Sequence, residues 1–247
     1  MKTDFSKTAF VSRYGELCGD PLRRPMTARQ LQAYADVRAS FVESLEDLLS
    51  PNGKTGGNAG VIACHVYSLM SRTGLAYHTA LHPLVMLESA EVFGIQLCPW
   101  QQLAVWFHDA IYIPGVAPGV SEQLSADLLR NLVRGADVEP ACDAIVCTGR
   151  WMDAKIPNLD EQCAEVMDLD IVSIAWPFKL AKLSDDAVSE ELRPFYGNER
   201  FAAGRLKFWQ TLRDRGFVYR SKRFREDDSL EPVAMGNVKR MIKAMTA

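Results

Sequence analysis

The chain has 247 residues, of which 48% are hydrophobic and 24% charged, and its formal net charge is −3. These values are ordinary for a globular protein of one domain, or of one domain with an extension. No run of roughly eighteen apolar residues exists, which excludes an evident membrane span. The first ten residues lack the apolar core of a signal peptide, and the six cysteines include no Cys-x-x-Cys pair, which argues against a zinc finger. We expect a cytoplasmic protein with free thiols and no membrane partner.

Helical periodicity dominates the sequence from residue 27 onward. A first helix is predicted over 27–50, with Thr27 as its N-cap, and it ends at a Gly/Asn-rich stretch, 50–59, that reads as a linker. Ser121 is expected to cap the helix that follows a Gly/Pro loop. Further helices are predicted near 60–72, 82–93, 99–112, 121–134, 138–150, 161–176, 178–192, 198–215 and 229–245.

Strand signals are few, and residues 217–224 are the one short segment that could be extended. We therefore expect an all-α protein. Residues 1–59 would form an N-terminal helical extension with its linker, and residues 60–247 a helical domain whose functional side chains come from several helices.

Three of the four histidines lie close together in the sequence, beside an aspartate. His78 and His82 are four residues apart, and the dipeptide His108-Asp109 follows after 25 intervening residues. An imidazole nitrogen and a carboxylate oxygen form the mixed ligand set that many divalent cations accept. One further carboxylate would complete a site that activates water for hydrolysis.

The local context strengthens this prediction. Pro99 suits the first turn of the helix predicted over 99–112, and apolar residues recur along that helix at a spacing that turns His108 inward. Pro83 disfavours helical geometry at His82, so a helix is expected to begin there. His65, in the apolar run VIACHVYSLM, is interpreted as an ordinary structural histidine.

These motifs resemble the HD superfamily of metal-dependent phosphohydrolases, whose pattern is H…HD…D. Within it, the chain is most similar to a bacterial group of predicted metal-dependent HD-superfamily phosphohydrolases, over about residues 65–245. The similar pieces are YHTALHPLVML, AVWFHDAIY, SEQLSA at 121–126, MDLDIVSIA at 167–175, Arg193 with Tyr196, FAAGRLKFW at 201–209, and SLEPVAMGNVKRMI.

The resemblance implies an HD-domain helical bundle that binds one divalent metal ion through His82, His108, Asp109 and a later aspartate. The candidates for the last ligand are Asp168 and Asp170. We favour Asp170, because the second aspartate of an Asp-x-Asp element is usually the ligand in similar proteins, and Asp168 would then have a structural role. The ligand set suits Mn, Fe, Mg, Co, Ni or Zn and does not separate them.

The element YHTALH also resembles the YHNxxH pattern of cyclic-nucleotide phosphodiesterases, which implies His78 as a general acid. The asparagine of that pattern is Thr79 here, and a supporting hydrogen bond is the other interpretation of His78. The group often has an acidic residue where this chain has Ile113, and a histidine near the position of Gly149. A single metal ion is therefore expected.

Basic residues concentrate between residues 193 and 225, with ten Lys or Arg against two acids. This cluster could attract an anionic substrate or nucleic acid, or form a solvated helix face. Arg193 and Arg205 lie in pieces shared with the group, and a guanidinium suits a phosphate. They are our candidates for substrate binding, although either could instead pair with an acid. Trp151 and Lys155 are weaker candidates for the wall of the pocket.

The functional expectation is hydrolysis of a phosphate ester, with a nucleotide-like metabolite as substrate and Asp109 orienting the attacking water. Nucleic acid is a less favoured partner than a small phosphorylated molecule, and the oligomeric state stays open. Two alternatives remain. One is a cyclic-nucleotide or dinucleotide phosphodiesterase, which needs an aromatic side chain for base stacking. The other is a non-catalytic HD module that binds a nucleotide without cleaving it.

Overall fold

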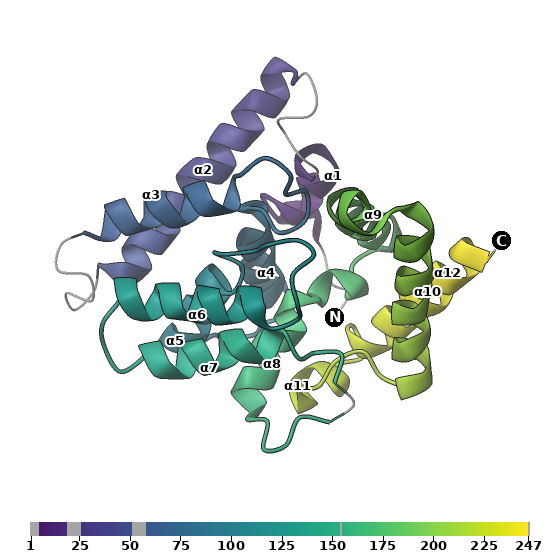
Figure 1. Cartoon of the computed structure of the whole chain (residues 1–247). Coiled ribbons are helices and arrows are strands. Elements are labelled where there is room, and N and C mark those ends of the chain that lie inside the picture. The colour runs from purple at the N-terminus through teal and green to yellow at the C-terminus, as the bar shows by residue number, and fades with distance from the viewer. Residues whose placement is uncertain (1–4, 19–25, 51–57, 154, 247) are drawn as a thin grey trace.

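The computed structural model describes residues 5–18, 26–50, 58–153 and 155–246. Figure 1 shows α4 and α8 near the middle of the molecule, α6 and α7 on one side, and α9, α10 and α12 on the other. The helices in chain order are η1 (Phe5–Lys7), η2 (Val11–Arg13), α1 (Tyr14–Leu17), α2 (Ala28–Leu49), α3 (Ala59–Met70), α4 (Leu81–Val92), α5 (Pro99–Phe107), α6 (Val120–Leu132), α7 (Val138–Thr148), α8 (Glu161–Asp170), η5 (Val172–Ala175), α9 (Phe178–Tyr196), α10 (Asn198–Arg215), α11 (Lys222–Arg225) and α12 (Glu231–Thr246).

The all-α prediction is confirmed, since the described residues contain no strand. The segment with a strand signal is irregular over 217–221 and then forms the short helix α11. The helix predicted over 161–176 ends at Asp170 and continues after one residue as a 3-10 turn. Most of the expected linker, residues 51–57, lies outside the described residues. The division at residue 59 stays a prediction.

Local sequence explains where two of the helices begin. Thr27 caps α2 as expected: its side chain accepts a hydrogen bond from the Gln30 amide, and the Gln30 side chain accepts one from the Thr27 amide. The expectation for Ser121 is wrong. Helix α6 begins at Val120, because Gly119 adopts a φ of 86° and turns the chain there. Ser121 lies inside the first turn and has a different partner.

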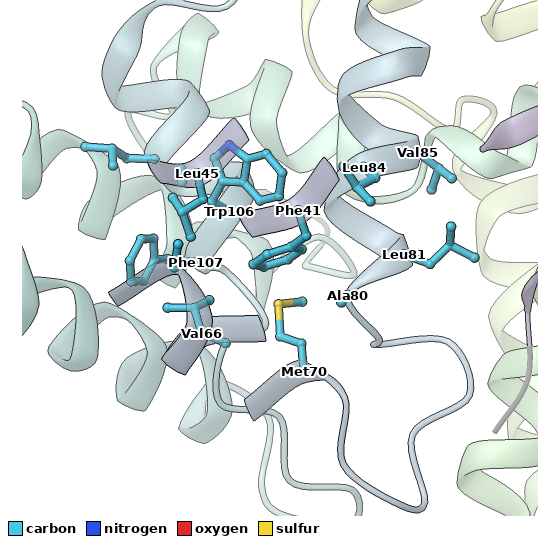
Figure 2. Close-up of a cluster of buried hydrophobic side chains, with 14 of the residues drawn as sticks. Phe41, Leu45, Val66, Met70, Ala80, Leu81, Leu84, Val85, Trp106 and Phe107 are labelled. Carbon is cyan, nitrogen blue, oxygen red and sulfur yellow. The ribbon is translucent and has the colours of Figure 1, made fainter. Parts of the chain in front are cut away.

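A first hydrophobic core lies under the N-terminal helices. Figure 2 shows Phe41 and Leu45 of α2, Val66 and Met70 of α3, Ala80, Leu81, Leu84 and Val85 at the start of α4, and Trp106 and Phe107 of α5 gathered in one cluster. The Phe41 and Trp106 rings meet edge to face with centroids 4.7 Å apart. Burying a large apolar side chain contributes roughly 1.5–3 kcal/mol, so this cluster holds α2 firmly against the start of α4 and the end of α5.

A second core joins the C-terminal helices to the same two central helices. Met86 and Ala90 of α4 and Val105 of α5 belong to it, together with buried residues of α8, η5, α10 and α12. Helices α4 and α5 therefore face one core on each side. The start of α4, the end of α5 and the end of α8 come together between the two cores. No described helix has the length and apolar character needed to cross a membrane.

Candidate metal centre

Four polar side chains converge at the ends of three helices. His82 lies in the first turn of α4, His108 and Asp109 follow the last residue of α5, and Asp170 is the last residue of α8. His82, His108 and Asp109 are buried, and Asp170 is half-buried. One ligand atom from each of the four lies within 4.8 Å of the others, which is close enough to hold a metal ion. This is the ligand set that the resemblance implies.

The distances inside the cluster are short for groups that cannot all hydrogen-bond to one another. Nε2 of His82 lies 3.0 Å from Oδ1 of Asp170 and 3.8 Å from Oδ2 of Asp109. Nε2 of His108 lies 2.9 Å from Oδ2 of Asp109 and 3.6 Å from Oδ1 of Asp170. The two nitrogens and two oxygens surround one point, as the ligands of a single cation do.

The environment of His108 fits a metal ligand. Its Nδ1 lies 2.9 Å from the carbonyl oxygen of Val105, an acceptor that requires the proton to be on Nδ1. In the neutral ring, Nε2 therefore carries a lone pair directed at the cluster. Nε2 of His108 and Oδ2 of Asp109 are both buried and form no hydrogen bond of adequate geometry. With the ring neutral, these two atoms are facing acceptors, and such a pair is costly in a protein interior unless a proton or a metal cation lies between them.

The electrostatics of the cluster favour positive charge. Burial tends to lower the pKa of His108, but the carboxylates of Asp109 and Asp170 outweigh burial and raise that pKa well above its usual value. Burial tends to raise the pKa of Asp170, but the two neighbouring histidines, His108 and His82, together outweigh burial and lower that pKa well below its usual value. Burial lowers the pKa of His82, which keeps its ring neutral and able to act as a ligand.

The two aspartates of the Asp-x-Asp element face different parts of the molecule. Asp170 faces the two histidines, whereas Asp168 accepts hydrogen bonds from the backbone amides of Arg220 and Ser221, both at 2.7 Å. Burial raises the pKa of Asp168 to about 7, although these donors oppose the rise. The geometry thus gives Asp168 a structural contact and leaves Asp170 beside the histidines.

His78 does not share a helix face with His82, because α4 begins at Leu81 and His78 lies in the turn before it. Its Nδ1 is 2.5 Å from Oε1 of Glu191, and its ring stacks on Tyr112 at a centroid distance of 3.6 Å. Burial alone would lower the pKa of His78, but the carboxylates of Glu191, Asp109 and Asp170 together outweigh burial, and the pKa rises to about 9. At neutral pH this ring is therefore an imidazolium, which can donate a proton.

The cluster opens into a cavity of about 280 Å³. His78, Asp109 and Asp170 line this cavity, and other lining residues are aromatic, aliphatic or charged. Aromatic side chains in the wall are Tyr77, Tyr112, Trp151, Phe208 and Trp209. A cavity of this size, lined by both charged and apolar side chains, suits a small organic ligand that carries a charged group.

The two candidate arginines lie in different environments. Arg205 lines the cavity, pairs with the Asp185 carboxylate and stacks over Phe208, with its Cζ 4.0 Å from the ring centroid. Arg193 is exposed, lies over the Phe201 ring at 5.7 Å, and does not line the cavity. The structure brings only Arg205 to the cluster. His65 is exposed on α3, and Lys155 is exposed and lies outside the cavity wall.

Sequence reasoning missed two carboxylates on α9, Glu191 and Asp185, although a signal for them exists. The buried residues of this helix include Ala181, Ser184, Asp185, Ala187 and Glu191. An acid on the apolar face of an amphipathic helix is unusual, because a buried carboxylate needs donors or a cation. Comparison of the chain with protein-family models, curated proteins and solved structures finds no match. The interpretation therefore rests on the geometry of the site.

Proposed function

We propose that the protein hydrolyses a phosphate ester of a nucleotide-like metabolite at a divalent metal site held by His82, His108, Asp109 and Asp170. The observation that carries this proposal is the buried convergence of these four ligands, in which His108 Nε2 and Asp109 Oδ2 lie 2.9 Å apart without a hydrogen bond of adequate geometry. The resemblance to the HD superfamily supports the same ligand set. A divalent cation bound there would polarise a phosphoryl oxygen and make water a stronger acid.

The protein's own side chains would supply the proton transfers. Asp109 lines the cavity, and its carboxylate can accept a hydrogen bond from the attacking water and take its proton. As the bond between phosphorus and the ester oxygen breaks, the imidazolium of His78 donates its proton to the leaving oxygen. Glu191 holds this imidazole in place and in its charged form. Arg205 lines the same cavity and is the better placed of the two arginines to bind an anionic substrate.

Cleavage of a phosphodiester is a second candidate within the same chemistry. The observation that favours it is the set of aromatic side chains in the cavity wall, where Tyr112 and Trp151 provide surfaces on which a base could stack. A nucleotide-binding module without turnover would use the same surfaces, but it would not need an imidazolium held beside a cation site.

Elemental analysis of the protein purified without chelator tests the proposal. We expect about one divalent ion per chain in the parent and none in the double variant His108→Ala/Asp109→Ala. The variant His65→Ala is a matched control, because His65 is an exposed histidine on α3 and should not change the metal content.

The same three proteins are then assayed on phosphomonoesters and phosphodiesters with Mn or Fe added. We expect phosphate-ester hydrolysis that is lost together with the metal in the double variant. Hydrolysis that survives the removal of both ligands would show that the mechanism is wrong. Tight nucleotide binding without turnover in any metal would favour the non-catalytic module instead.

A further inference from the structure

Glu122 is a carboxylate of the cavity wall that the proposed reaction does not use. It lies in the first turn of α6, is half-buried, and lines the cavity together with Asp109 and Asp170. Among the described residues it forms no ion pair and no hydrogen bond to another side chain. A carboxylate in a cavity wall without a protein partner is available to a ligand.

Two serines of α6, Ser121 and Ser125, fix the helix turn that carries Glu122. The hydroxyl of Ser121 accepts a hydrogen bond from the Ile113 amide at 3.0 Å, and the hydroxyl of Ser125 both accepts from the Ile111 amide at 3.0 Å and donates to the Ile111 carbonyl at 3.1 Å. Ser121 and Ser125 thereby tie one face of α6 to the segment that follows His108-Asp109. The two serines of the SEQLSA element therefore have a structural role, and Glu122 lies next to the helix face that they anchor.

Gly149, at the end of α7, makes room for the carboxylate. A Cβ atom added to Gly149 would lie 2.8 Å from Cδ and 3.0 Å from Oε1 of Glu122, closer than packed atoms come. The φ of Gly149 is −65°, so its backbone does not itself require glycine. A side chain at this position would therefore require the Glu122 carboxylate to move from the place it occupies beside Gly149.

Glu122 differs from the other acids of the site in its charge balance. Arg205 balances Asp185, and the His78 imidazolium balances Glu191. A divalent cation would balance Asp109 and Asp170. Glu122 is left without a cationic partner, and burial together with the nearby Asp109 and Asp170 raises its pKa. A phosphate group would be repelled by this carboxylate, so the part of a substrate that contacts it must carry hydrogen-bond donors instead.

We propose that Glu122 is a specificity residue that accepts hydrogen bonds from hydroxyl groups on the alcohol part of the substrate, as a ribose 2′- and 3′-diol would supply. This inference rests on the proposed function, which places the phosphate on the cation-binding residues of the same cavity. The two carboxylate oxygens can accept from two neighbouring hydroxyls, and charge-assisted hydrogen bonds are stronger than neutral ones. Trp151, also in the wall, offers an apolar face beside such a sugar.

The test uses adenosine 5′-monophosphate and its 2′,3′-dideoxy analogue with the metal-loaded full chain. The two nucleotides are compared by their dissociation constants, measured by calorimetry. For a nucleotide that is turned over, the KM is used in place of the dissociation constant. The parent should prefer the ribonucleotide by about 10- to 100-fold, the range expected for a hydroxyl bonded to a charged acceptor in a buried site. Glu122→Gln should bring this ratio close to one while the metal content, measured by elemental analysis, stays at the parent value.

Two further variants separate this role from a general disturbance of the site. Gly149→Ala should lower the same ratio, because the added methyl group displaces the Glu122 carboxylate. Glu139→Gln should leave the ratio unchanged, because Glu139 is an exposed residue of α7 that pairs with Arg130. If Glu122→Gln lost affinity or turnover equally for both nucleotides, the proposal would be overturned in favour of a role in water activation. If the variant lost a metal ion, it would be overturned in favour of Glu122 as a cation ligand.

The outcomes for the parent protein distinguish this inference from the proposed function. A parent that prefers the ribonucleotide in a Glu122-dependent way but releases no phosphate would contradict the hydrolase and support Glu122. A parent that releases phosphate with no hydroxyl preference would contradict only the role of Glu122. A parent that binds neither nucleotide would contradict both.

Discussion

Two irregular segments, residues 76–78 and 218–221, are held by buried or half-buried carboxylates in the same manner. Oε2 of Glu191 accepts hydrogen bonds from the amides of residues 76, 77 and 78 at 2.8, 3.0 and 3.2 Å. In the second segment, Glu231 accepts from the amides of residues 218 and 219 at 2.6 and 3.0 Å, and Asp168 from those of 220 and 221. In both cases a distant acid satisfies consecutive backbone donors that no helix supplies with partners.

The two segments differ in what else the carboxylate binds. Glu191 uses its other oxygen to hold the ring of His78, so one residue both shapes the turn and sets the charge of a cavity side chain. Asp168 and Glu231 accept from the backbone amides of the second segment, Asp168 also interacts with the Ser221 side chain, and the segment packs into the C-terminal core through Val218 and Tyr219. The same hydrogen-bonding arrangement therefore positions a cavity side chain in the first segment and supports core packing in the second.

The largest expected effect is on stability, in the second segment. Asp168→Ala leaves the buried Ser221 amide and the partly buried Arg220 amide without an acceptor, and we expect a loss of about 3 kcal/mol in the free energy of unfolding, measured in urea. Because Asp168 faces away from the histidines, the folded variant should bind as much metal per chain as the parent. Asp170→Asn is the matched control at the other aspartate of α8. It should lose metal and keep most of the stability of the metal-free protein.

Loss of metal from Asp168→Ala with normal stability would contradict the division of roles between the two aspartates.

The first segment should respond in activity rather than in stability alone. Glu191→Gln keeps a hydrogen-bond acceptor for the turn but removes the charge beside His78. We expect kcat for a phosphate ester to fall about tenfold to a hundredfold, within the range for general acid catalysis, with little change in KM. The alkaline limb of the pH profile should move to lower pH, because His78 loses the carboxylate that raises its pKa.

The double variant His78→Gln/Glu191→Gln sharpens this test. If Glu191 acts through His78, its removal should cost no further activity once His78 is absent. A full additional loss would mean that Glu191 serves only the backbone of the turn, as Asp168 does in the second segment.

The smallest effect is a pH dependence of stability in the metal-free protein. The pKa of His78 is about 9 in the folded chain and 6.5 without the fold. Between these values only the folded chain holds the proton. The stability that His78 contributes is therefore fully present below pH 6.5 and is lost as the pH rises through 9. Urea unfolding at pH 6.5 and 9.5 should show a loss from this group of about 2 kcal/mol, somewhat less than the shift alone would give because the ring is partly exposed.

The variant His78→Gln provides the reference for that measurement, since the other titrating groups remain in it. The difference between parent and variant isolates His78. Equal pH dependence in the two proteins would contradict the charged His78–Glu191 pair.

Several elements could be predicted from the sequence because their signals are local. The capping box at Thr27 and Gln30 involves neighbouring residues, and the start of α4 near His82 follows from the restriction that Pro83 imposes. The end of α8 could not be predicted in this way. Apolar residues continue past Asp170 at a spacing that suits either an α-helix or a 3-10 turn, and packing of η5 in the C-terminal core decides between them.

The sequence by itself determined the helical class and the H…HD…D pattern, because helix periodicity and the order of ligand residue types are written along the chain. Only the tertiary structure decided that Asp170 rather than Asp168 lies beside the histidines, that Glu191 is the partner of His78, and that Arg205 rather than Arg193 reaches the cavity. The physical reason is that these contacts join residues distant in the chain. They depend on how helices cross and which side of each helix the two cores cover, and no local pattern of residues encodes that geometry.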